Sequence, residues 1–352
     1  MKDSVRSKDM TVAVYNCIRE IPQKEWDALV DYRMCCTSAW LGLFEESIQE
    51  DILPYYITVS RGTDLVGGAV CYKTKRKLLK VSIPYIACMV PFSEEKFFIK
   101  KGETSKTMSV LFNALERTAR NEKALMIFVP YLSGESLTFF KEKGCTLMKT
   151  APLAQLNVQW KTFNEFLGSL TRKSKKSIRH VLNQGKRRGL TLEHSHDFSD
   201  ADNLFSIYMD NLERHHYEHT IPFTRDLFRN FEKYVGDQVY VLRCFLEDDL
   251  LGYWIYFFDG THANMALSGI DYSYPREYDA YFNICYDGVR EMIEKGCTLI
   301  EFGSTTYEVK RRIGCSMKQT SAAVKGMNPL LNIGYKPLAL LQNMRMERDY
   351  PE

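Results

Sequence analysis

The same succession of strand and helix patterns occurs twice along this chain of 352 residues, and no other feature of the sequence limits the fold as much. Residues 56–60 and 64–72 are two runs rich in β-branched and aromatic side chains, joined by a short polar turn. Residues 240–245 and 249–257 repeat that arrangement. Two such runs around a short turn are typical of a β-hairpin. A repeated unit decides the architecture, so it takes precedence over any local motif.

The elements after each hairpin also follow one order. A third strand pattern is followed by an amphipathic helix, a buried strand and a short helix that ends at a glycine. The order β-β-β-α-β-α-β therefore appears twice, which argues against accident. The corresponding segments are 81–90 and 263–271 for the third strand, 108–119 and 281–293 for the helix, 124–129 and 298–302 for the buried strand, and 140–145 and 310–315 for the short helix.

The remaining segments are mostly helical by pattern. Residues 161–231 separate the two copies and begin with a continuous apolar helix face. Residues 26–48 predict one or two helices before the first hairpin. The tail, 329–352, contains an apolar run at 338–341, and we expect it to dock as a helix or a strand.

Composition places the chain among ordinary globular proteins: 45% of the residues are hydrophobic, 26% are charged, and the net charge is +3. No apolar run reaches the ~18 residues that a membrane span needs, and the first residues lack the apolar core of a signal peptide. Ten cysteines without a C-x-x-C pair favour a reducing compartment. We therefore expect a cytoplasmic protein with no membrane span, in which Cys71, Cys88, Cys244 and Cys285 are small buried apolar residues rather than metal or redox groups.

Four stretches carry a likeness to known proteins: residues 26–29, residues 44–47, the segment LTRKSKKSIR at 170–179 and the segment GSTTYEVKRRIG at 303–314. An antiparallel meander that leads into an α-β-α-β unit resembles the GNAT-type N-acyltransferase fold. Two such units joined by a basic helical segment resemble the Fem-type aminoacyl transferases. Their relatives include the BioF2-like acyltransferases and the family loosely called peptidoglycan biosynthesis/recognition proteins.

This resemblance implies an α+β fold of two tandem GNAT-like domains, each with a mixed, mostly antiparallel sheet flanked by helices. We expect residues 1–160 to form an N-terminal domain with a mainly structural role on the acceptor side. Residues 161–352 would form the catalytic C-terminal domain, which begins with the basic helical segment 161–190. The implied activity is the transfer of an acyl group to an amino group, with no resident cofactor and no metal. The donor is then a co-substrate, either acyl-CoA or an aminoacyl-tRNA.

Two absences bear on the donor. Neither copy has the Q/R-x-x-G-x-G/A loop that single-domain acetyl-CoA enzymes usually carry before the central helix. No heptad run is long enough for the coiled-coil arm that Fem enzymes binding tRNA often add. Because the chain is compact and lacks such an arm, acyl-CoA is the first choice of donor and aminoacyl-tRNA is the alternative.

A basic segment concentrates the positive charge of the chain, with eight lysines and arginines and no carboxylate between Glu165 and Glu193. Such a stripe attracts the phosphates of CoA, a nucleotide or RNA, although a solvated helix face explains it equally well. Arg172 and Arg179 are the better candidates, because guanidinium groups offer a fixed fork of donors. If the chain has this fold, the donor's phosphates would also lie near three residues before the second central helix: Tyr274, Arg276 and Tyr278.

Residues 302–310 lie where a strand ends and a short helix begins, a place that exposes backbone N–H groups and hydroxyls. In Fem-type enzymes a lysine at the matching place is thought to stabilise the intermediate, so the resemblance implies that role for Lys310. The alternative is a surface cation near a helix C-terminus, which the helix dipole favours. Ser304 and Tyr307, just before Lys310, are candidates for binding the acceptor.

Two carboxylates are candidates for accepting the proton of the acceptor amine. Asp271 ends the third strand of the second copy, where it could orient or deprotonate an amine but could equally cap the following helix. Glu301 alternates with Ile300 and Phe302 on the central strand, so its side chain should point to the opposite face. A charge on such a strand is costly unless it faces a cleft, which makes Glu301 a candidate general base.

The segment His215-His216-Tyr217-Glu218-His219 matches H-x-x-E-H, an inverted zinc-protease motif. On a helix, His215 and His219 would share a face, as metal ligands require. No third ligand is evident, so we favour a histidine-rich helix end that lines an acceptor groove and keep a zinc enzyme as an alternative.

Together these patterns predict an N-acyltransferase that moves an acyl group from acyl-CoA to an amino group of a small molecule, a peptide or an amino sugar entering between the two copies. The first alternative is a Fem-type, aminoacyl-tRNA-dependent, amide-forming transferase, with tRNA as a partner. The second is a non-catalytic module that binds a phosphate ligand on a degenerate transferase scaffold. DNA is not among the expected partners.

Overall fold

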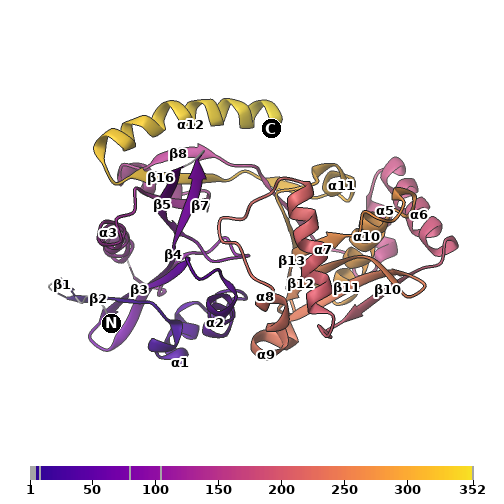
Figure 1. Cartoon of the computed structure of the whole chain (residues 1–352), viewed down its shortest axis with the longest axis horizontal. Helices are drawn as coiled ribbons and strands as arrows, with labels where there is room; N and C mark the ends of the chain where they lie inside the picture. Colours follow the sequence, from indigo (N-terminus) through magenta and orange to yellow (C-terminus); the bar gives the residue numbers. More distant parts are fainter. Residues whose placement is uncertain (1–4, 8, 79–80, 104, 351–352) are drawn as a thin grey trace. The chain divides into compact units, whose positions relative to one another are not determined.

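The computed structural model describes residues 5–7, 9–78, 81–103 and 105–350, and it divides into two compact units (Figure 1). Unit 1 contains Met1–Ala151, His219–Thr224 and Gln319–Glu352. Unit 2 contains Pro152–Glu218 and Arg225–Lys318. In the part of the chain that is described, none of the helices combines the length and hydrophobicity needed to cross a bilayer.

The sheet of unit 1 has the strand order β1-β2-β3-β4-β5-β7-β16-β8, and β6 pairs with β4. Neighbouring strands are antiparallel except β5 and β7, which run parallel. The hairpin that the sequence predicted is formed by β3 and β4. The strands are β1 (Val5–Ser7), β2 (Met10–Tyr15), β3 (Leu53–Arg61), β4 (Asp64–Leu78), β5 (Val81–Cys88), β6 (Phe97–Ile99), β7 (Met126–Leu132), β8 (Thr146–Lys149) and β16 (Ser321–Gly326).

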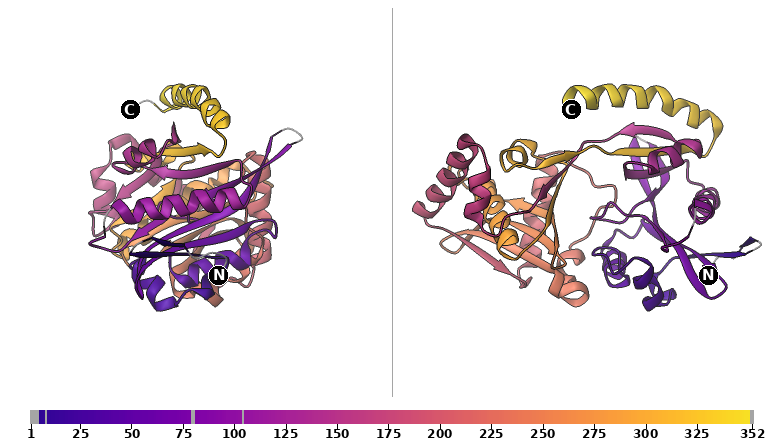
Figure 2. Two further views of the ribbon diagram at one scale, coloured as in Figure 1. Left: turned by 90° about the vertical axis from the view of Figure 1, so that its left-hand side faces the viewer. Right: turned by 180° about the vertical axis from the view of Figure 1, so that it is seen from behind.

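Helix α3 packs across strands β3 and β4 of unit 1 (Figure 2), because Leu111, Phe112 and Leu115 line one face of it and are fully buried. The last helix, α12, runs along β8 and β16 (Figure 1). The tail that we expected to dock as a helix or a strand is thus a helix. The helices of unit 1 are α1 (Gln23–Leu29), α2 (Ser38–Ser47), α3 (Ser105–Asn121), α4 (Ser136–Glu142) and α12 (Pro329–Asp349).

Unit 2 repeats this architecture, with the strand order β10-β11-β12-β13-β14-β9-β15. Strands β13 and β14 form its parallel pair, as β5 and β7 do in unit 1. The strands are β9 (Leu153–Asn157), β10 (Leu190–Ser195), β11 (Val239–Leu246), β12 (Asp249–Phe258), β13 (His262–Ile270), β14 (Leu299–Gly303) and β15 (Ser316–Lys318). The helices are α5 (Phe163–Ser169), α6 (Arg172–Arg187), α7 (Ala201–Arg214), α8 (Asp226–Arg229), α9 (Phe231–Val235), α10 (Ala280–Glu294) and α11 (Tyr307–Arg312).

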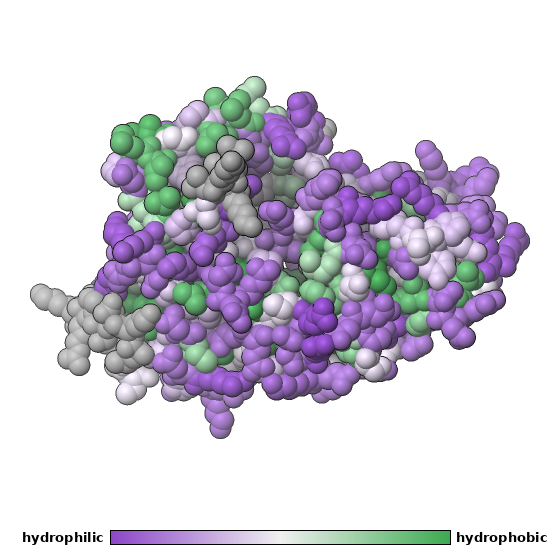
Figure 3. Space-filling model, viewed as in Figure 1, coloured by the Kyte–Doolittle hydropathy of each residue, from purple (hydrophilic) through white to green (hydrophobic). Residues whose placement is uncertain are grey.

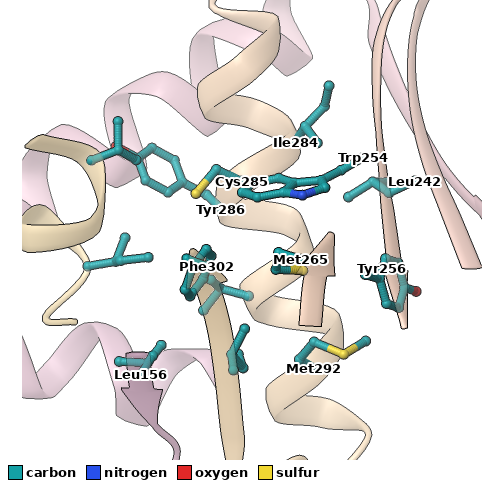
Figure 4. Close-up of a cluster of buried hydrophobic side chains, with 14 of the residues drawn as sticks. Leu156, Leu242, Trp254, Tyr256, Met265, Ile284, Cys285, Tyr286, Met292 and Phe302 are labelled. Atoms are coloured by element: carbon teal, nitrogen blue, oxygen red, sulfur yellow. The ribbon is translucent and has the colours of Figure 1, made fainter. Parts of the chain in front are cut away.

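The main core of unit 2 lies between its sheet and helices α5, α6 and α10. Figure 4 shows Phe302, Met265 and Tyr256 on the neighbouring strands β14, β13 and β12, with their side chains toward α10. Helix α7 covers part of the opposite face, where the Tyr253 hydroxyl donates a hydrogen bond to the Leu204 carbonyl oxygen at 2.7 Å. Both faces of the centre of the sheet are therefore covered.

The duplicated pattern is confirmed: each unit has a mixed, mostly antiparallel sheet that contains one parallel pair of strands. The short helices α4 and α11 begin about one turn earlier than expected, and each is followed by a left-handed glycine, Gly144 at φ 76° and Gly314 at φ 83°. The interval between the copies is not wholly helical, because Leu190–Ser195 forms β10 at the edge of the sheet of unit 2.

The boundary between the units differs from the expected division into 1–160 and 161–352. Strand β9 precedes residue 160, yet it lies between β14 and β15 in the sheet of unit 2. Strand β16 follows residue 161 by a long way, yet it lies between β7 and β8 in the sheet of unit 1. Strand pairing between distant segments, which the hydrophobic pattern does not record, sets this division.

Candidate active site

Lys310 on α11 is the most deeply buried ionisable residue at the C-terminal end of β14, with 1% of its surface exposed. Its Nζ donates hydrogen bonds to the carbonyl oxygens of Phe302 at 2.6 Å and Gly303 at 3.3 Å. Burial lowers the pKa of Lys310 to about 8. Lys310 is thus not the surface cation of the alternative interpretation. An ammonium has three N–H donors, so its two carbonyl partners leave one donor over.

The turn between β14 and α11 brings Lys310 back to the strand that precedes it. Gly303 has a φ of 67° and Thr306 a φ of 52°, so the chain reverses through two left-handed residues. The Tyr307 hydroxyl donates to the Pro152 carbonyl oxygen at 2.7 Å, which ties α11 to the start of β9. Nζ of Lys310 lies 5.9 Å from the centre of the Tyr307 ring. Ser304, within this turn, is half-buried.

Aromatic side chains line the sheet beside this turn. The ring of Trp254 stacks on Tyr281 at 5.9 Å and meets Phe302 edge-on at 5.9 Å. Tyr281, in the first turn of α10, is hydrogen-bonded to the side chain of Thr306, and burial raises the pKa of its hydroxyl. Phe302, whose carbonyl oxygen accepts the shorter hydrogen bond of Lys310, is therefore part of a packed aromatic cluster, some of which appears in Figure 4.

Strand β13 separates from β14 next to Lys310's partners. Three residue pairs join the two strands, the last of them Asn264 with Glu301, and in the described ladder residues 265–270 of β13 have no partner on β14. Ile255 of β12 pairs with Leu267, whereas Phe257 pairs with Asn264, so β13 carries one extra residue at 265–266. Such a bulge leaves one residue outside the ladder and bends the strand. The sheet thus opens at a bulge close to the end of β14.

Glu301 lies on the face of β14 opposite to Ile300 and Phe302, as alternation along a strand requires. It is half-buried, and its Oε1 accepts a hydrogen bond from Nε2 of Gln155 at 3.1 Å. Glu301 and Lys310 thus belong to the same end of β14, while the Glu301 carboxylate lies on the far face of the sheet from the α10 core.

Asp271 follows β13 and lines a cavity of about 360 Å³. Its Oδ1 accepts a hydrogen bond from the backbone N–H of Ser273 at 2.8 Å, so its carboxylate closes a turn. The cap of α10 is Asp279, and the alternative of Asp271 as a helix cap is therefore wrong. The cavity is lined by Ile207, Asp210, Arg214, Ile270, Asp271, Tyr272 and Ser273.

Charged and aromatic groups meet at the rim of this cavity. The Arg214 guanidinium lies 4.3 Å from the centre of the Tyr272 ring, a cation–π contact. Nε2 of His215 lies 3.0 Å from the Tyr272 hydroxyl. The cavity thus offers an arginine and two carboxylates, Asp210 and Asp271, to one small ligand.

The two histidines of the H-x-x-E-H motif do not share a helix face, which corrects that interpretation. Helix α7 ends at Arg214, so both histidines follow it in irregular backbone. His219 belongs to unit 1, and burial lowers its pKa to about 4. Of the two, His215 belongs to the same unit as Asp271. The zinc-enzyme alternative loses the helical geometry on which it depended.

Two arginines and a histidine act on Asp279, the residue that caps the start of α10. Burial is the largest influence on the Asp279 carboxyl and raises its pKa, while Arg188, His180 and Arg312 act in the opposite direction. Arg312 is held by Ser177, whose Oγ lies 3.2 Å from Nη1, and by Glu308, whose Oε1 lies 2.9 Å from Nη2.

The donor-binding candidates lie on α6 and in the segment that precedes α10. Arg172 and Arg179 are exposed on α6 and form no ion pair with the described residues. Tyr274 is hydrogen-bonded to Asp249, and Arg276 is exposed. The backbone carbonyl of Tyr278 accepts from the Asn283 side chain at 3.2 Å.

Sequence reasoning missed Trp254, Tyr281, His180 and Arg214. No local motif marks them, because their importance comes from the neighbours that the sheet and helices bring to them. Arg312 could have been found from the sequence, since it lies in the stretch 303–314 that carries the family resemblance and is followed by the glycine that ends its helix.

Comparisons with solved structures show the same fold. FemX matches with a TM-score of 0.62 at 14% identity, over 90% of this chain and 98% of FemX. A tandem GNAT protein from the clavulanic acid biosynthesis pathway matches with a TM-score of 0.58 at 11% identity, over 91% of this chain and 99% of that one. L-PGS from Bacillus licheniformis matches with a TM-score of 0.53 at 13% identity, over 91% and 97%. No curated protein matches the sequence.

A family model named FemAB_like and described as peptidoglycan biosynthesis/recognition matches residues 79–332, well over half of the chain. Its range includes strands β5 to β8 of unit 1, the whole of unit 2 and strand β16. This protein belongs to the FemAB-like family.

Proposed function

We propose that this protein is an N-acyltransferase that moves an acyl group from acyl-CoA to an amino group, and that unit 2 carries out the chemistry. The observation that carries the proposal is Lys310, a buried ammonium with two carbonyl partners and one remaining donor, at the point where β13 leaves β14. Its FemAB-like family and tandem GNAT-like fold support an amide-forming transferase in peptidoglycan-related processes.

The reaction would proceed by direct attack of the amine. The acceptor nitrogen forms a bond to the thioester carbonyl carbon, the C–S bond breaks, and CoA leaves as the thiol after receiving the proton that the amine gives up. Lys310 would donate its remaining N–H to the oxyanion that develops on the carbonyl oxygen. The bulge at 265–266 frees backbone groups of β13 that would hold the thioester in the opening of the sheet.

The acceptor amine would be held by carboxylates. Asp271 is our first candidate for receiving the proton of the amine, directly or through a water, because it lines the cavity at the end of β13. Glu301 is the second candidate, held in place by Gln155. Ser304, Tyr307 and His215 would contact the acceptor from the turn after β14 and from the end of α7.

The phosphates of the donor would lie near the start of α10. Arg188 and Arg312 already supply positive potential there. Arg172 and Arg179 on α6, with Tyr274, Arg276 and Tyr278 before α10, would extend this surface. An aminoacyl-tRNA donor is the second candidate, favoured by the eight exposed or half-exposed basic side chains in and just after α6, a run suited to an RNA backbone.

The test compares two buried lysines in an assay that detects the CoA thiol released from acyl-CoA in the presence of amines. Lys310→Met should reduce turnover by roughly 10²–10³-fold, as the loss of one oxyanion donor does, with an unchanged circular dichroism spectrum. Lys96→Met is the matched control, because Nζ of Lys96 also donates to backbone carbonyls, those of Pro130 and Tyr131, but in unit 1.

Turnover should survive in the Lys96 variant. Full activity of Lys310→Met would remove Lys310 from the mechanism, and loss of activity in the Lys96 variant alone would move the chemistry to unit 1. If none of the acyl-CoA substrates releases its thiol, and the protein instead retains aminoacyl-tRNA in a salt-sensitive way, the second donor would be selected.

A further inference from the structure

Helix α12 turns its polar face toward the protein and its apolar face away from it. The side chains on its inner face are anchored by hydrogen bonds to backbone groups of unit 1. Oδ1 of Asn343 accepts from the N–H of Lys149 at 2.6 Å, and the side-chain amide of Asn332 donates to the Gly144 carbonyl oxygen at 3.1 Å. Polar contacts therefore hold α12 on β8 and β16.

The outer face of α12 carries a stripe of large apolar side chains, each between 55% and 77% exposed. Spacings of three, four and seven residues place the stripe along one side of the helix. In Figure 3, hydrophobic side chains gather at the place that α12 occupies in Figure 1. We call this stripe the α12 ridge; its residues are Leu330, Ile333, Leu338, Leu340, Leu341 and Met344.

A stripe of this kind is not explained by the stability of unit 1, since a helix on a protein surface normally buries its apolar side. Contiguous exposed apolar surface marks a place of interaction. Gly334 and Pro337 are poor helix formers, so the helix depends on its anchors to present the ridge.

The charges of α12 favour a negatively charged partner surface. Its two carboxylates are already neutralised, Glu347 by Lys149 at 2.7 Å and Asp349 by Arg345 and Arg348. Lys336 is exposed and forms no ion pair with the described residues. The side chains of Arg345 and Arg348 remain 67% and 76% exposed.

The geometry points to the surface of an anionic phospholipid bilayer as the partner, and we propose that α12 lies in the plane of that surface. A stable protein interface takes about 800 Å² and roughly 20–30 residues from each partner, far more than one convex ridge of six side chains supplies. A bilayer needs no matching groove. Helices with one apolar face lie at the boundary between headgroups and acyl chains, with basic side chains reaching the anionic lipids.

The experiment is flotation of the full chain with vesicles of phosphatidylcholine alone or mixed with phosphatidylglycerol. The wild type should float with the mixed vesicles and less with the neutral ones. Leu340→Gln with Leu341→Gln should lower the partition coefficient by about tenfold or more, because two large apolar contacts are lost. Glutamine keeps the helix propensity, and an unchanged melting temperature verifies the fold. Lys336→Gln should weaken binding about fivefold on the mixed vesicles and leave the neutral ones unaffected.

Met209→Gln is the matched control, since it removes another exposed apolar side chain from a helix of unit 2. It should float like the wild type. Failure of the wild type to float with either vesicle would overturn the proposal, as would equal binding by the double variant. A dimer in light scattering that the double variant abolishes, without vesicle binding, would assign the ridge to a second copy of the chain instead.

Discussion

Two lysines from unrelated sequence positions satisfy the same kind of backbone group in the two units. Lys310 follows β14 and binds the carbonyls of Phe302 and Gly303, whereas Lys96 precedes β6 and binds those of Pro130 and Tyr131 at the end of β7. Both strands reach a left-handed residue there, Gly303 at φ 67° and Tyr131 at φ 53°. A carbonyl turned out of the ladder and buried needs a donor, and a long side chain can supply it from either direction.

The buried ammonium of Lys310 makes stability depend on pH in a definite direction. Its pKa is about 8 in the folded chain, below the ordinary 10.5, so the unfolded state binds more protons between these values. Stability should therefore rise with pH from 8 to 10.5, by about 3 kcal/mol from this group. Lys310→Met should lack that rise.

Urea unfolding of both proteins across this pH range measures the difference. Subtracting the variant removes the tyrosines and cysteines whose raised pKa values act in the opposite direction. A difference between the two proteins that stays constant with pH would show that Lys310 keeps an ordinary pKa.

At the level of elements, alternation and helical spacing were sufficient to predict the hairpins, the central helices and the buried strands that follow them in both units. They were insufficient for β10, because Leu190–Ser195 is an edge strand that follows a long basic helix and is nowhere fully buried. Within the candidate site, the place of Lys310 on the short helix after β14 was predictable from its motif, whereas the contact of Arg214 with Tyr272 was not, because it forms where two elements meet. Only the packing of α7 against β13 brings those two together.

A glycine in the contact between α6 and α10, Gly185, can be compared with an uncrowded helical glycine, Gly168 of α5. A Cβ on Gly185 would lie 2.5 Å from Oδ1 of Asn283, whose side chain is held by the carbonyls of Tyr278 and Asp279. Gly185→Ala should therefore destabilise the protein by about 1–3 kcal/mol. Gly168→Ala in α5, where a Cβ meets nothing within 4 Å, should instead be neutral or stabilise by up to about 1 kcal/mol.

Thermal and urea unfolding of the two variants measure this difference in stability. If the two variants are equally stable, α6 and α10 can move apart to accommodate the added methyl group. The close approach at Gly185 would then make no contribution to stability. Because Asn283 also holds the backbone before α10, the Gly185 variant should lose affinity for a phosphate ligand along with stability.

At the scale of the whole molecule, the two units are not successive lengths of chain. Strand β9 directly follows the first segment of unit 1 in the chain but completes the sheet of unit 2. Strand β16 follows the last segment of unit 2 but completes the sheet of unit 1. Each exchanged strand lies between two partners rather than at an edge. Removing either one would leave two strands with unpaired backbone groups, a condition that promotes aggregation.

This exchange predicts how fragments behave. A fragment of residues 1–160 lacks β16, so β7 and β8 lose their shared neighbour, and a fragment of residues 161–352 lacks β9 between β14 and β15. Neither fragment should fold cooperatively alone, because each loses the hydrogen bonds of an interior strand. Expressed together, they should associate and recover the circular dichroism and melting behaviour of the intact chain, since every strand pair is then available. A cooperative melting transition of either fragment by itself would contradict this, and would mean that the sheets tolerate the loss of an interior strand.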